Sequence, residues 1–580
     1  MTHADDPNTL DFSSLPPYQP RTFVPPGANL ADARTVVGLY QGLLDRPVAS
    51  SEALERWLLD RSELDAAVDQ HQAILYIRMT CQTDDADRAA AYKEFVETVV
   101  PPVSSISDKL DRKYLEARRT CPLPERRYGV YERRVRADVE LFREENVPLK
   151  TEESLLAQEY QTVTGAMTVE FQGAERTMPE MGKFLLEPDR PLREAAWRAT
   201  ARRRLADRDR LDDLFEKMLG LRGRIAANAG CRDFGEYQFR AMHRFDYTPA
   251  DCRQYHETVA RQVVPLWREI HEDRRRRMRV ETLRPWDTAA DPEGRPPLRP
   301  FEQADQLVSK AIDVFRRTDP ALGEQFARMD RLALLDLASR KGKAPGGYQA
   351  SLGEARKPFI FMNAVGTDDD VRTLLHEGGH AFHSLAAAEE PLIAYRHAPM
   401  EFCEVASMGM ELLAEGHLGV FYNAGDLKRS RRRHVEGIVF ILPWVATIDA
   451  FQQWIYAHPG HSRAERRAAW LEIFDRFSGG VVDWTDLAEE KAASWHRQLH
   501  IFEYPFYYIE YGIAQLGALQ LWVRARQDGA AALAGYRRAL ALGGSRPLPE
   551  LFAAAGIRFD FSEATIGPLM EVVAEELARL

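Results

Sequence analysis

The sequence has few cysteines, and their positions do not suggest a disulfide framework. Five cysteines occur in 580 residues, they are scattered, and no two of them form a C-x-x-C pair. This pattern is typical of buried thiols in a reducing compartment. Residues 1–28 are acidic and rich in proline, and they lack the apolar stretch that forms the core of a signal peptide. We therefore expect a cytoplasmic protein.

A long hydrophobic run and an excess of positive charge are also missing. The most apolar window, Ile438 to Ile448, contains Pro443 and stops at Asp449, whereas a membrane helix needs about 18 apolar residues. The chain has 77 basic and 88 acidic side chains, which gives a net charge of −11. Proteins that bind nucleic acid usually carry a basic patch or stripe. We expect neither a membrane nor nucleic acid as a partner.

Helical periodicity dominates what the sequence does contain. From Leu211 to Ile225, apolar residues recur at spacings of three and four, and Gly230 is suited to follow the end of this helix. Similar stripes occur in residues 50–80, 255–271 and 563–580. The sequence therefore predicts a mainly α fold, without the fixed period of a solenoid.

Two other kinds of segment interrupt this pattern. Residues 283–300 contain five prolines and are predicted to form a long surface connection and a domain boundary. Two arginine-rich runs, residues 274–277 and 431–433, could bind an anion. Nearby acids such as Glu272 and Asp273 favour solvated helix faces instead.

A small sheet is predicted in the middle of the chain. Three short apolar runs, Leu334–Ala338, Tyr348–Leu352 and Pro358–Met362, are separated by glycine and proline. Such runs indicate strands, and their close spacing favours an antiparallel sheet inside a helical protein.

The next helix carries the residues that indicate chemistry. It is predicted to begin at Thr367, followed by three aspartates that approximate a capping box. The helix contains His376-Glu377-Gly378-Gly379-His380, an H-E-x-x-H motif. Residues four apart lie on one face of a helix, so His376 and His380 can bind one metal ion. Glu377 lies beside them, where it can act as a base on a water molecule at the metal.

The two glycines inside this motif and a histidine just after it need a separate explanation. Glycine in a helix costs roughly 1 kcal/mol relative to alanine, so we interpret Gly378 and Gly379 as sites of close packing beneath the metal. His383, one turn after His380, is interpreted as a structural histidine.

A third metal ligand is expected downstream, because catalytic zinc usually has three protein ligands and one open position. Residues 400–413 resume helical character and contain three acids. Glu404 and Glu411 lie seven residues apart on one face, so that Glu404 can bind the metal while Glu411 orients a histidine ligand. Spacing alone leaves Glu401 as a rival ligand.

The residues quoted so far resemble a known family. HEGGHAFHS followed by EFCEVASMGMELL resembles the thimet oligopeptidase and oligoendopeptidase F family of zinc metallopeptidases. The resemblance extends to GGYQASL upstream and to HIFEYPFYYIEYGIAQL downstream, and covers roughly residues 190–530. The chain length suits the oligoendopeptidase F branch.

The resemblance implies a set of site residues. It assigns the third zinc ligand to Glu404 rather than Glu401, and maps Glu411 onto a later family glutamate. A downstream histidine and several tyrosines face the metal in family members and contact the substrate carbonyl. In this sequence they correspond to His500 and one or two of Tyr507, Tyr508 and Tyr511, and which tyrosine donates to the oxyanion stays open.

The resemblance also implies the architecture. We expect a mainly α, two-lobed metallopeptidase with a deep substrate channel and the small antiparallel sheet beside the motif helix. Residues 1–190 would form one wall of the channel, and residues 191–580 would form the catalytic region. Such a channel admits short flexible peptides and excludes folded proteins.

The small sheet is predicted to bind substrate. An extended peptide can add to an exposed sheet edge through main-chain hydrogen bonds. Gly346 and Gly347 would let the two backbones approach closely. The alternative interpretation is that this pair only forms a turn. Tyr348, the first residue of the following strand, belongs to the same predicted substrate-binding set.

The sequence thus predicts a zinc endopeptidase that cleaves short oligopeptides and holds one zinc ion per chain. A carboxy-dipeptidase of the same family is the near alternative. A catalytically silent helical peptide-binding scaffold is the other, although the intact Glu377 argues against it. The sequence leaves peptide preference and oligomeric state open.

Overall fold

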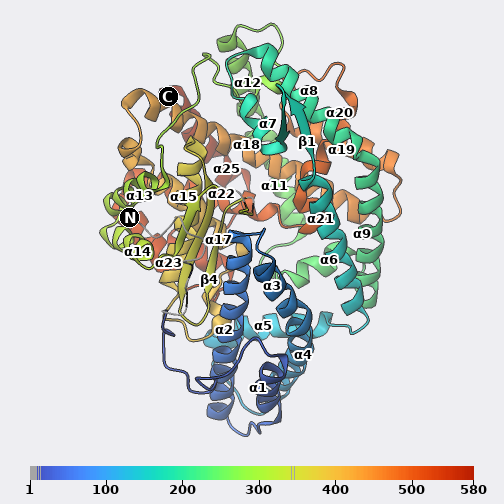
Figure 1. Cartoon of the computed structure of the whole chain (residues 1–580), viewed down its shortest axis with the longest axis vertical. Coiled ribbons are helices and arrows are strands. Elements are labelled where there is room, and N and C mark those ends of the chain that lie inside the picture. The colour runs from blue at the N-terminus through green and yellow to red at the C-terminus, as the bar shows by residue number, and fades with distance from the viewer. Residues whose placement is uncertain (1–9, 11, 13–14, 341, 345) are drawn as a thin grey trace. The chain divides into compact units, whose positions relative to one another are not determined.

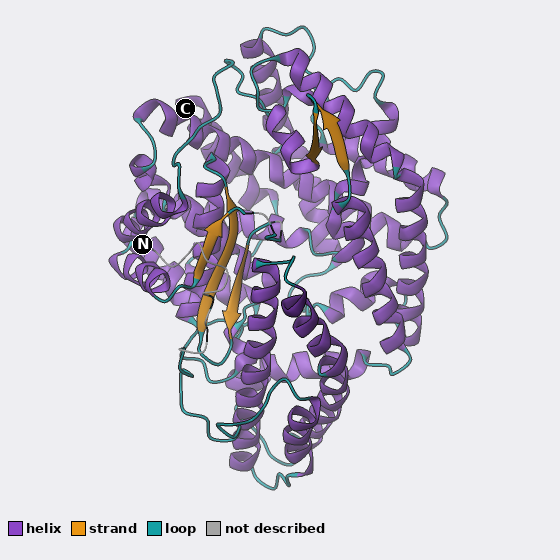
Figure 2. Cartoon of the chain, in the orientation of Figure 1, coloured by secondary structure: helices purple, strands orange, loops and turns teal. Residues whose placement is uncertain are grey.

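The prediction of a mainly α fold is confirmed. The computed structural model describes residues 10, 12, 15–340, 342–344 and 346–580. Within these residues the chain is helical, with one two-stranded and one three-stranded sheet. Figure 2 shows how small a part of the chain the strands form.

The chain divides into two compact units, each assembled from three separate stretches. Unit 1 comprises residues 1–140, 299–428 and 514–559, and unit 2 comprises residues 141–298, 429–513 and 560–580. The boundary predicted between residues 190 and 191 does not separate these units, because it falls inside unit 2. The substrate channel stays a prediction.

Unit 1 contains the three-stranded sheet and the helices around it (Figure 1). Its elements are α1 (Ala33–Asp45), α2 (Ser51–Cys81), α3 (Ala86–Thr98), α4 (Val100–Ala117), α5 (Glu125–Leu141), α13 (Ala304–Thr318), α14 (Pro320–Arg331), β3 (Leu335–Ala338), β4 (Tyr348–Leu352), β5 (Lys357–Ala364), α15 (Asp368–Ala386), α16 (Ile393–Arg396), α17 (Met400–Leu413), η4 (Glu415–Val420), α23 (Gly529–Leu540) and α24 (Leu548–Ala555).

Unit 2 contains the two-stranded sheet. Its elements are α6 (Asn146–Gly165), β1 (Thr168–Phe171), β2 (Ala174–Thr177), α7 (Met178–Phe184), α8 (Arg190–Ala206), α9 (Arg208–Asn228), α10 (Phe234–Ala241), α11 (Pro249–Gln262), α12 (Val264–Met278), η3 (Pro285–Asp287), α19 (Arg463–Phe477), α20 (Ala488–Ala492), η5 (Ser494–Arg497), α21 (Leu499–Glu503) and α25 (Glu563–Arg579). Helices α18 (Ala424–Ala457) and α22 (Ile509–Gln527) have residues in both units, and the last residue of α5, Leu141, belongs to unit 2.

Helix α18 contains the apolar window noted in the sequence. It is the one helix in the described part of the chain that is long and apolar enough to cross a membrane. However, 61% of its most apolar 18-residue window is buried inside the protein. A core helix has the same length and composition, so this helix is weak evidence for a membrane span.

The three-stranded sheet is mixed, which corrects the prediction of an antiparallel sheet. Strand β5 lies in the middle, antiparallel to β4 and parallel to β3. The connection from β3 to β4 therefore passes the end of β5 instead of forming a hairpin. Lys343 in this connection donates hydrogen bonds to the carbonyls of Asp336, Ala338 and Met362, which belong to both parallel strands.

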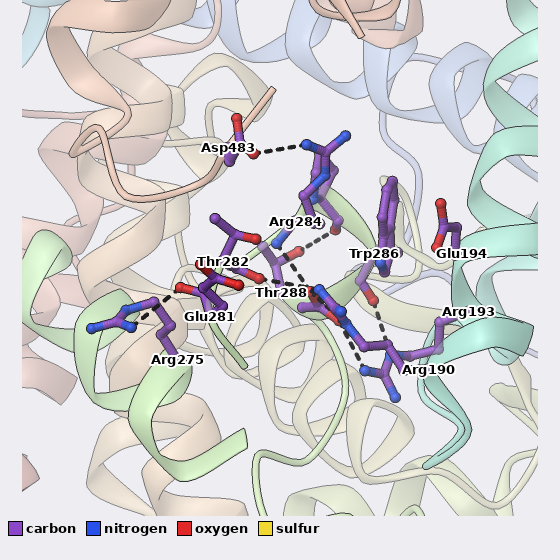
Figure 3. A network of polar contacts seen from close by, with 12 residues as sticks. Arg190, Arg193, Glu194, Arg275, Glu281, Thr282, Arg284, Trp286, Thr288 and Asp483 are labelled. Atoms are coloured by element: carbon purple, nitrogen blue, oxygen red, sulfur yellow. Dashed lines mark hydrogen bonds and ion pairs between the residues drawn. The ribbon is translucent and has the colours of Figure 1, made fainter. Parts of the chain in front are cut away.

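The predicted surface connection at residues 283–300 is partly wrong. Leu283 and residues 285–287, near its beginning, are buried, and the Asp287 side chain is fully enclosed. Arg190 and Arg193 of α8 form ion pairs with the Asp287 carboxylate at 2.8 and 2.9 Å, and the backbone N–H of Arg284 donates to it as well (Figure 3). These contacts compensate the burial of a charge. The boundary predicted in this segment is nearer the observation, since the first stretch of unit 2 ends at Leu298.

The Glu63 carboxylate of α2 binds the backbone of residues 22–24 near the start of unit 1. Glu63 of α2 accepts hydrogen bonds from the backbone N–H groups of Thr22, Phe23 and Val24 and from the Thr22 hydroxyl. Burial alone would raise the pKa of the Glu63 carboxyl, but the three N–H donors lower it below its usual value.

This arrangement predicts a pH-dependent loss of stability. Replacing Glu63 with glutamine should destabilise the protein by about 1–3 kcal/mol at pH 7, because charge-assisted hydrogen bonds are lost. A lowered pKa stabilises the fold above the unfolded-state value of about 4.3, and this stabilisation disappears as the pH falls through the folded-state value. Thermal unfolding from pH 7 down to pH 3 should therefore show the two proteins converging in acid. Glu97→Gln, at an exposed site of α3, is the matched control; an equal loss in both variants would refute the role of Glu63.

Candidate metal centre

The helix that carries the H-E-x-x-H motif begins as predicted. Thr367 is the N-cap of α15, and its side chain and that of Asp370 form a reciprocal capping box. The cap satisfies backbone N–H groups that the first helical turn leaves unpaired. The prediction of a capped helix at Thr367 is therefore confirmed, and the two motif histidines lie on one face of it.

Helices α15 and α17 of unit 1 bring three potential metal ligands together. One donor atom each from His376, His380 and Glu404 lies within 4.8 Å of the others, and they form the one such group found among the described residues. The Glu404 Oε2 atom lies 3.3 Å from His376 Nε2 and 3.7 Å from His380 Nε2. Two imidazoles and one carboxylate are a donor set that suits Zn²⁺ with an open position. Glu401, the rival on spacing, does not belong to this group.

The charges in this group favour a bound cation. Burial alone would raise the pKa of Glu404, but the hydrogen bond from His376 and the charges of His376 and His380 lower it to about 2. Burial would lower the pKa of His376, yet its hydrogen bonds with Glu404 and Glu411 raise it well above its usual value. The two carboxylates therefore stabilise positive charge at the place where the donor atoms converge.

Burial shifts the pKa values of the other two motif residues, His380 and Glu377, in opposite directions. Burial lowers the pKa of His380 to about 4, so its imidazole is neutral at pH 7 and free to bind a metal. Burial raises the pKa of the Glu377 carboxyl to about 7, while the positive charge of His376 acts in the opposite direction. His383 lies outside the donor group, packed with its ring centroid 6.0 Å from that of Phe402.

Close packing explains both motif glycines. A Cβ atom on Gly379 would lie 2.5 Å from Ser407 Cα and 2.6 Å from the Ala406 carbonyl oxygen, both in the backbone of α17. A Cβ atom on Gly378 would lie 2.6 Å from the Phe315 ring. Gly379 thus lets α17 approach α15 closely enough for Glu404 to lie beside the two histidines, in agreement with the interpretation made from the sequence.

Glu411 lies where it was expected to orient a ligand. Its Oε1 atom is 2.8 Å from His376 Nδ1, the ring nitrogen that faces away from Glu404. A carboxylate in this position fixes the imidazole orientation and makes the other nitrogen a better donor. Ser407, which spacing did not single out, donates to Glu404 Oε2 at 3.1 Å.

The contact predicts the effect of removing the Glu411 charge. Glu411→Gln should lower the affinity for Zn²⁺ by about 10- to 100-fold, the usual effect of losing such a partner. Competition with a chromogenic chelator measures this change. Asp369→Asn changes an exposed acid on α15, the helix that carries His376, and should leave the affinity unaltered. An unchanged affinity in Glu411→Gln would show that His376 does not need this orientation.

The predicted substrate-binding residues surround the start of β4, an edge strand of the sheet. Gly346 has a backbone φ of 93°, so a turn accounts for this glycine. A Cβ atom on Gly347 would make ordinary contacts, the nearest at 3.4 Å. The Tyr348 ring stacks on Phe361, and its hydroxyl is 2.6 Å from the Thr80 hydroxyl. Their role in binding substrate stays a prediction.

The predicted histidine and tyrosines form a cluster in unit 2. The His500 ring centroid lies 5.7 Å from that of Tyr507, 4.9 Å from Tyr508 and 5.8 Å from Tyr511. Sequence reasoning missed Gln498, whose side-chain nitrogen is 2.8 Å from His500 Nδ1 and whose oxygen accepts from Trp444 Nε1. The cluster belongs to unit 2 and the metal ligands to unit 1, so that its approach to the metal stays a prediction.

A second residue missed from the sequence fixes this cluster. Arg244 Nη2 donates to the Phe506 carbonyl and to Glu510 Oε1, at 2.6 and 2.7 Å. Both members of the Arg244–Glu510 pair are buried, and the pair spans 266 positions of sequence. No local signal in the sequence could have revealed it.

The fold and the donor group together define a helical protein with a His-His-Glu site suited to a catalytic metal. A family model described as peptidase family M3 matches residues 184–570. Because this match covers more than half of the sequence, the chain belongs to peptidase family M3. The resemblance identified from the motifs is thereby confirmed.

Relatives and solved structures agree with this assignment. Oligoendopeptidase F of Lactococcus lactis subsp. cremoris is 33% identical over 104 residues, 17% of this chain and 16% of that protein. An oligoendopeptidase F homolog of Borreliella burgdorferi is 24% identical over 268 residues, 43% of this chain and 42% of that protein. These matches span less than half the length of the curated relatives.

Two solved structures match over almost the whole chain. A structure described as a candidate oligoendopeptidase F has 28% identity and a TM-score of 0.87, covering 97% of this chain and 99% of the other. A structure of PZ peptidase A with an inhibitor has 26% identity and a TM-score of 0.88, covering 96% and 99%.

Proposed function

We propose that this protein is a zinc-dependent endopeptidase that hydrolyses internal peptide bonds of short oligopeptides. The observation that carries the proposal is the convergence of His376, His380 and Glu404 beside Glu377, in a chain of peptidase family M3. The names of the relatives, oligoendopeptidase F above all, support oligopeptides as the substrate class.

The donor group fits zinc, and the residues that would hold it are His376, His380 and Glu404. When bound, zinc supplies a Lewis acid that polarises a carbonyl and makes water more acidic. Glu411 holds His376 in the orientation that presents Nε2 to the ion.

Glu377 moves the proton in this proposal. Its carboxylate accepts a proton from the attacking water and then delivers it to the nitrogen of the leaving amine. The motif spacing places Glu377 one residue after the ligand His376, while its own oxygens lie outside the donor group. The carboxylate thus remains available to the reacting water and the leaving nitrogen.

The substrate is positioned by two further groups of residues. The outer edge of β4 would hold an extended peptide through main-chain hydrogen bonds, which do not depend on the side chains of the peptide. His500 and one of Tyr507, Tyr508 and Tyr511 would donate hydrogen bonds to the oxyanion that forms during attack. Their mutual contacts in unit 2 support a joint role.

One experiment tests the whole proposal. The purified protein should contain about one zinc per chain and cleave internally quenched peptides, and chelation should abolish cleavage until zinc is restored. Mass spectrometry of the products distinguishes internal cleavage from release of C-terminal dipeptides. A protein that binds zinc but cleaves nothing in a broad peptide library would refute the proposal and favour a peptide-binding scaffold.

We also propose that the protein works in the cytoplasm. Its five cysteines are all free thiols, and four of them are buried. Free buried thiols are typical of a reducing compartment.

A further inference from the structure

A large cavity inside unit 2 is unrelated to the metal ligands. Its volume is about 520 Å³. It is lined by residues of α6, α7, α8, α9, α12, η3, α18, α19, α20 and η5, and of the loops beside them. This volume lies within the range of about 300–1,000 Å³ that is usual for small-molecule sites. All lining residues belong to unit 2.

Seven tryptophan and phenylalanine side chains contribute to the apolar wall of this cavity. Trp267 and Trp444 flank Phe440, with ring centroids 5.4 and 6.2 Å from it, and Phe440 is 40% exposed. On another wall, the ring centroid of Trp484 lies 6.0 Å from that of Trp197 and 5.7 Å from that of Phe474. An exposed phenylalanine among tryptophans is a surface on which an apolar ligand would gain free energy by burial.

Two arginines in the lining lack the acidic partners that other arginines of this protein have. Among the described residues, neither Arg204 of α8 nor Arg497 of η5 forms an ion pair with a carboxylate. The arginine-rich runs noted in the sequence behave differently: Arg274 pairs with Glu436 at 3.2 Å, and Arg432 with Asp273 at 2.9 Å. The arginines beside the cavity therefore leave charge that the protein itself does not neutralise.

The two cationic groups also influence each other. The surrounding protein lowers the pKa of the Arg497 guanidinium although the residue is exposed, and the charge of Arg204 lowers this pKa further. Arg497 lies over the Trp444 ring, with its central carbon 5.4 Å from the ring centroid. The lining contains one acid, Glu490, which does not offset both charges. An anion bound beside the two guanidinium groups would relieve their repulsion.

The walls that carry these groups are fixed in place. The Asp287 network described above holds η3 against α8, and its neighbours Pro285 and Thr288 line the cavity. On the side of Arg497, the Tyr160 hydroxyl donates to the His496 carbonyl at 2.9 Å, and His496 Nε2 lies 3.2 Å from Asp212. When a ligand binds a site whose walls are already formed, less free energy is lost in ordering side chains and loops.

We propose that this cavity is a binding site for a carboxylate carried on an apolar, preferably aromatic, body. Arg204 and Arg497 pair with the carboxylate, and the wall of Trp267, Phe440 and Trp444 covers the apolar part. Such a ligand is either a free organic acid or the C-terminal end of a peptide with an apolar last residue. The proposal concerns binding alone and does not depend on peptidase activity.

A matched pair of ligands tests the role of the carboxylate. In isothermal titration calorimetry with the full-length zinc-loaded protein, N-acetyl-tryptophan should bind about 10- to 100-fold more tightly than N-acetyl-tryptophanamide, since charge-assisted hydrogen bonds are lost in the amide. Arg204→Gln and Arg497→Gln should each remove most of this preference. Arg202→Gln, at an exposed position of the same helix α8, should retain it. Equal binding of acid and amide, or a preference that survives both substitutions, would overturn the proposal.

A second variant tests the apolar wall without touching a charge. Ala201→Leu places extra apolar volume in the cavity lining and should weaken both the acid and the amide, whereas unchanged binding of both would place the site elsewhere. Thermal unfolding of each variant verifies that it is folded. A peptide source predicts that an acetylated tripeptide ending in tryptophan binds more tightly than N-acetyl-tryptophan; a free organic acid predicts that lengthening weakens binding.

Discussion

Replacing Glu377 with glutamine should lower kcat for peptide cleavage by about 10²- to 10⁴-fold, the usual contribution of a general base. Glutamine has nearly the same shape but cannot accept the proton of the attacking water. Because Glu377 lies outside the donor group of His376, His380 and Glu404, the variant should still bind about one zinc per chain. Cleavage of a quenched peptide and metal analysis of the same sample provide the two measurements.

The control for this prediction is a second acid-to-amide change on the same helix. Asp369→Asn lies eight residues before Glu377, at an exposed position of α15, and should keep full activity. If Glu377→Gln retains activity within threefold, the proposed proton transfer is wrong. If it loses zinc, Glu377 belongs to the metal-binding set, and its assignment as the base fails.

Gly379→Ala should have the second large effect, on the metal site as a whole. The added Cβ atom would meet backbone atoms of Ala406 and Ser407, which cannot rotate away as a side chain can. We expect a destabilisation of about 1–3 kcal/mol or more from overpacking, and a loss of zinc binding because α17 carries Glu404. Thermal unfolding and zinc titration measure these two effects.

Gly220→Ala provides the matched control. Gly220 also lies inside a helix, α9, but a Cβ atom there would have no neighbour within 4 Å. The same substitution should therefore stabilise the protein by about 1 kcal/mol, the helix propensity difference between the two residues. If both variants behave alike, the packing of Gly379 against α17 is not what places Glu404.

Local patterns in the sequence predicted local structure well. The apolar stripe from Leu211 to Ile225 is the buried face of α9, and Gly230 follows the helix with a φ of 73°. The capping box at Thr367 formed as predicted. In these segments the residues that determine the structure lie within one or two helical turns of one another, so periodicity and capping rules suffice.

Features that depend on distant residues were not predictable in the same way. The close spacing of the three apolar runs favoured an antiparallel sheet, but β5 lies between β3 and β4 and pairs with β3 in parallel. The prolines of residues 283–300 suggested exposure, although Asp287 is buried by two arginines nearly 100 positions away. A single amino-acid sequence contains no signal for contacts between residues so far apart along the chain.

The candidate site also contains some residues that local patterns predicted and others that depend on distant parts of the chain. Residues His376, Glu377 and His380 follow from one helical turn, and the downstream helix limits the third ligand to a few acids. The contacts made by Glu404 then distinguish it from Glu401, which spacing alone could not do. His500 and the tyrosines were identified through the resemblance, and their partners Gln498 and Arg244 became evident only in the structure.

The contact at Gly379 also constrains how this protein can evolve. A larger residue at this position must be preceded by a change that moves the backbone of Ala406 or Ser407, since these atoms occupy the space of its Cβ. Substitutions at residues in contact are not additive, so the order in which they arise decides whether an intermediate remains functional. Helices α15 and α17 should therefore accumulate changes at their crossing as coupled pairs rather than one by one.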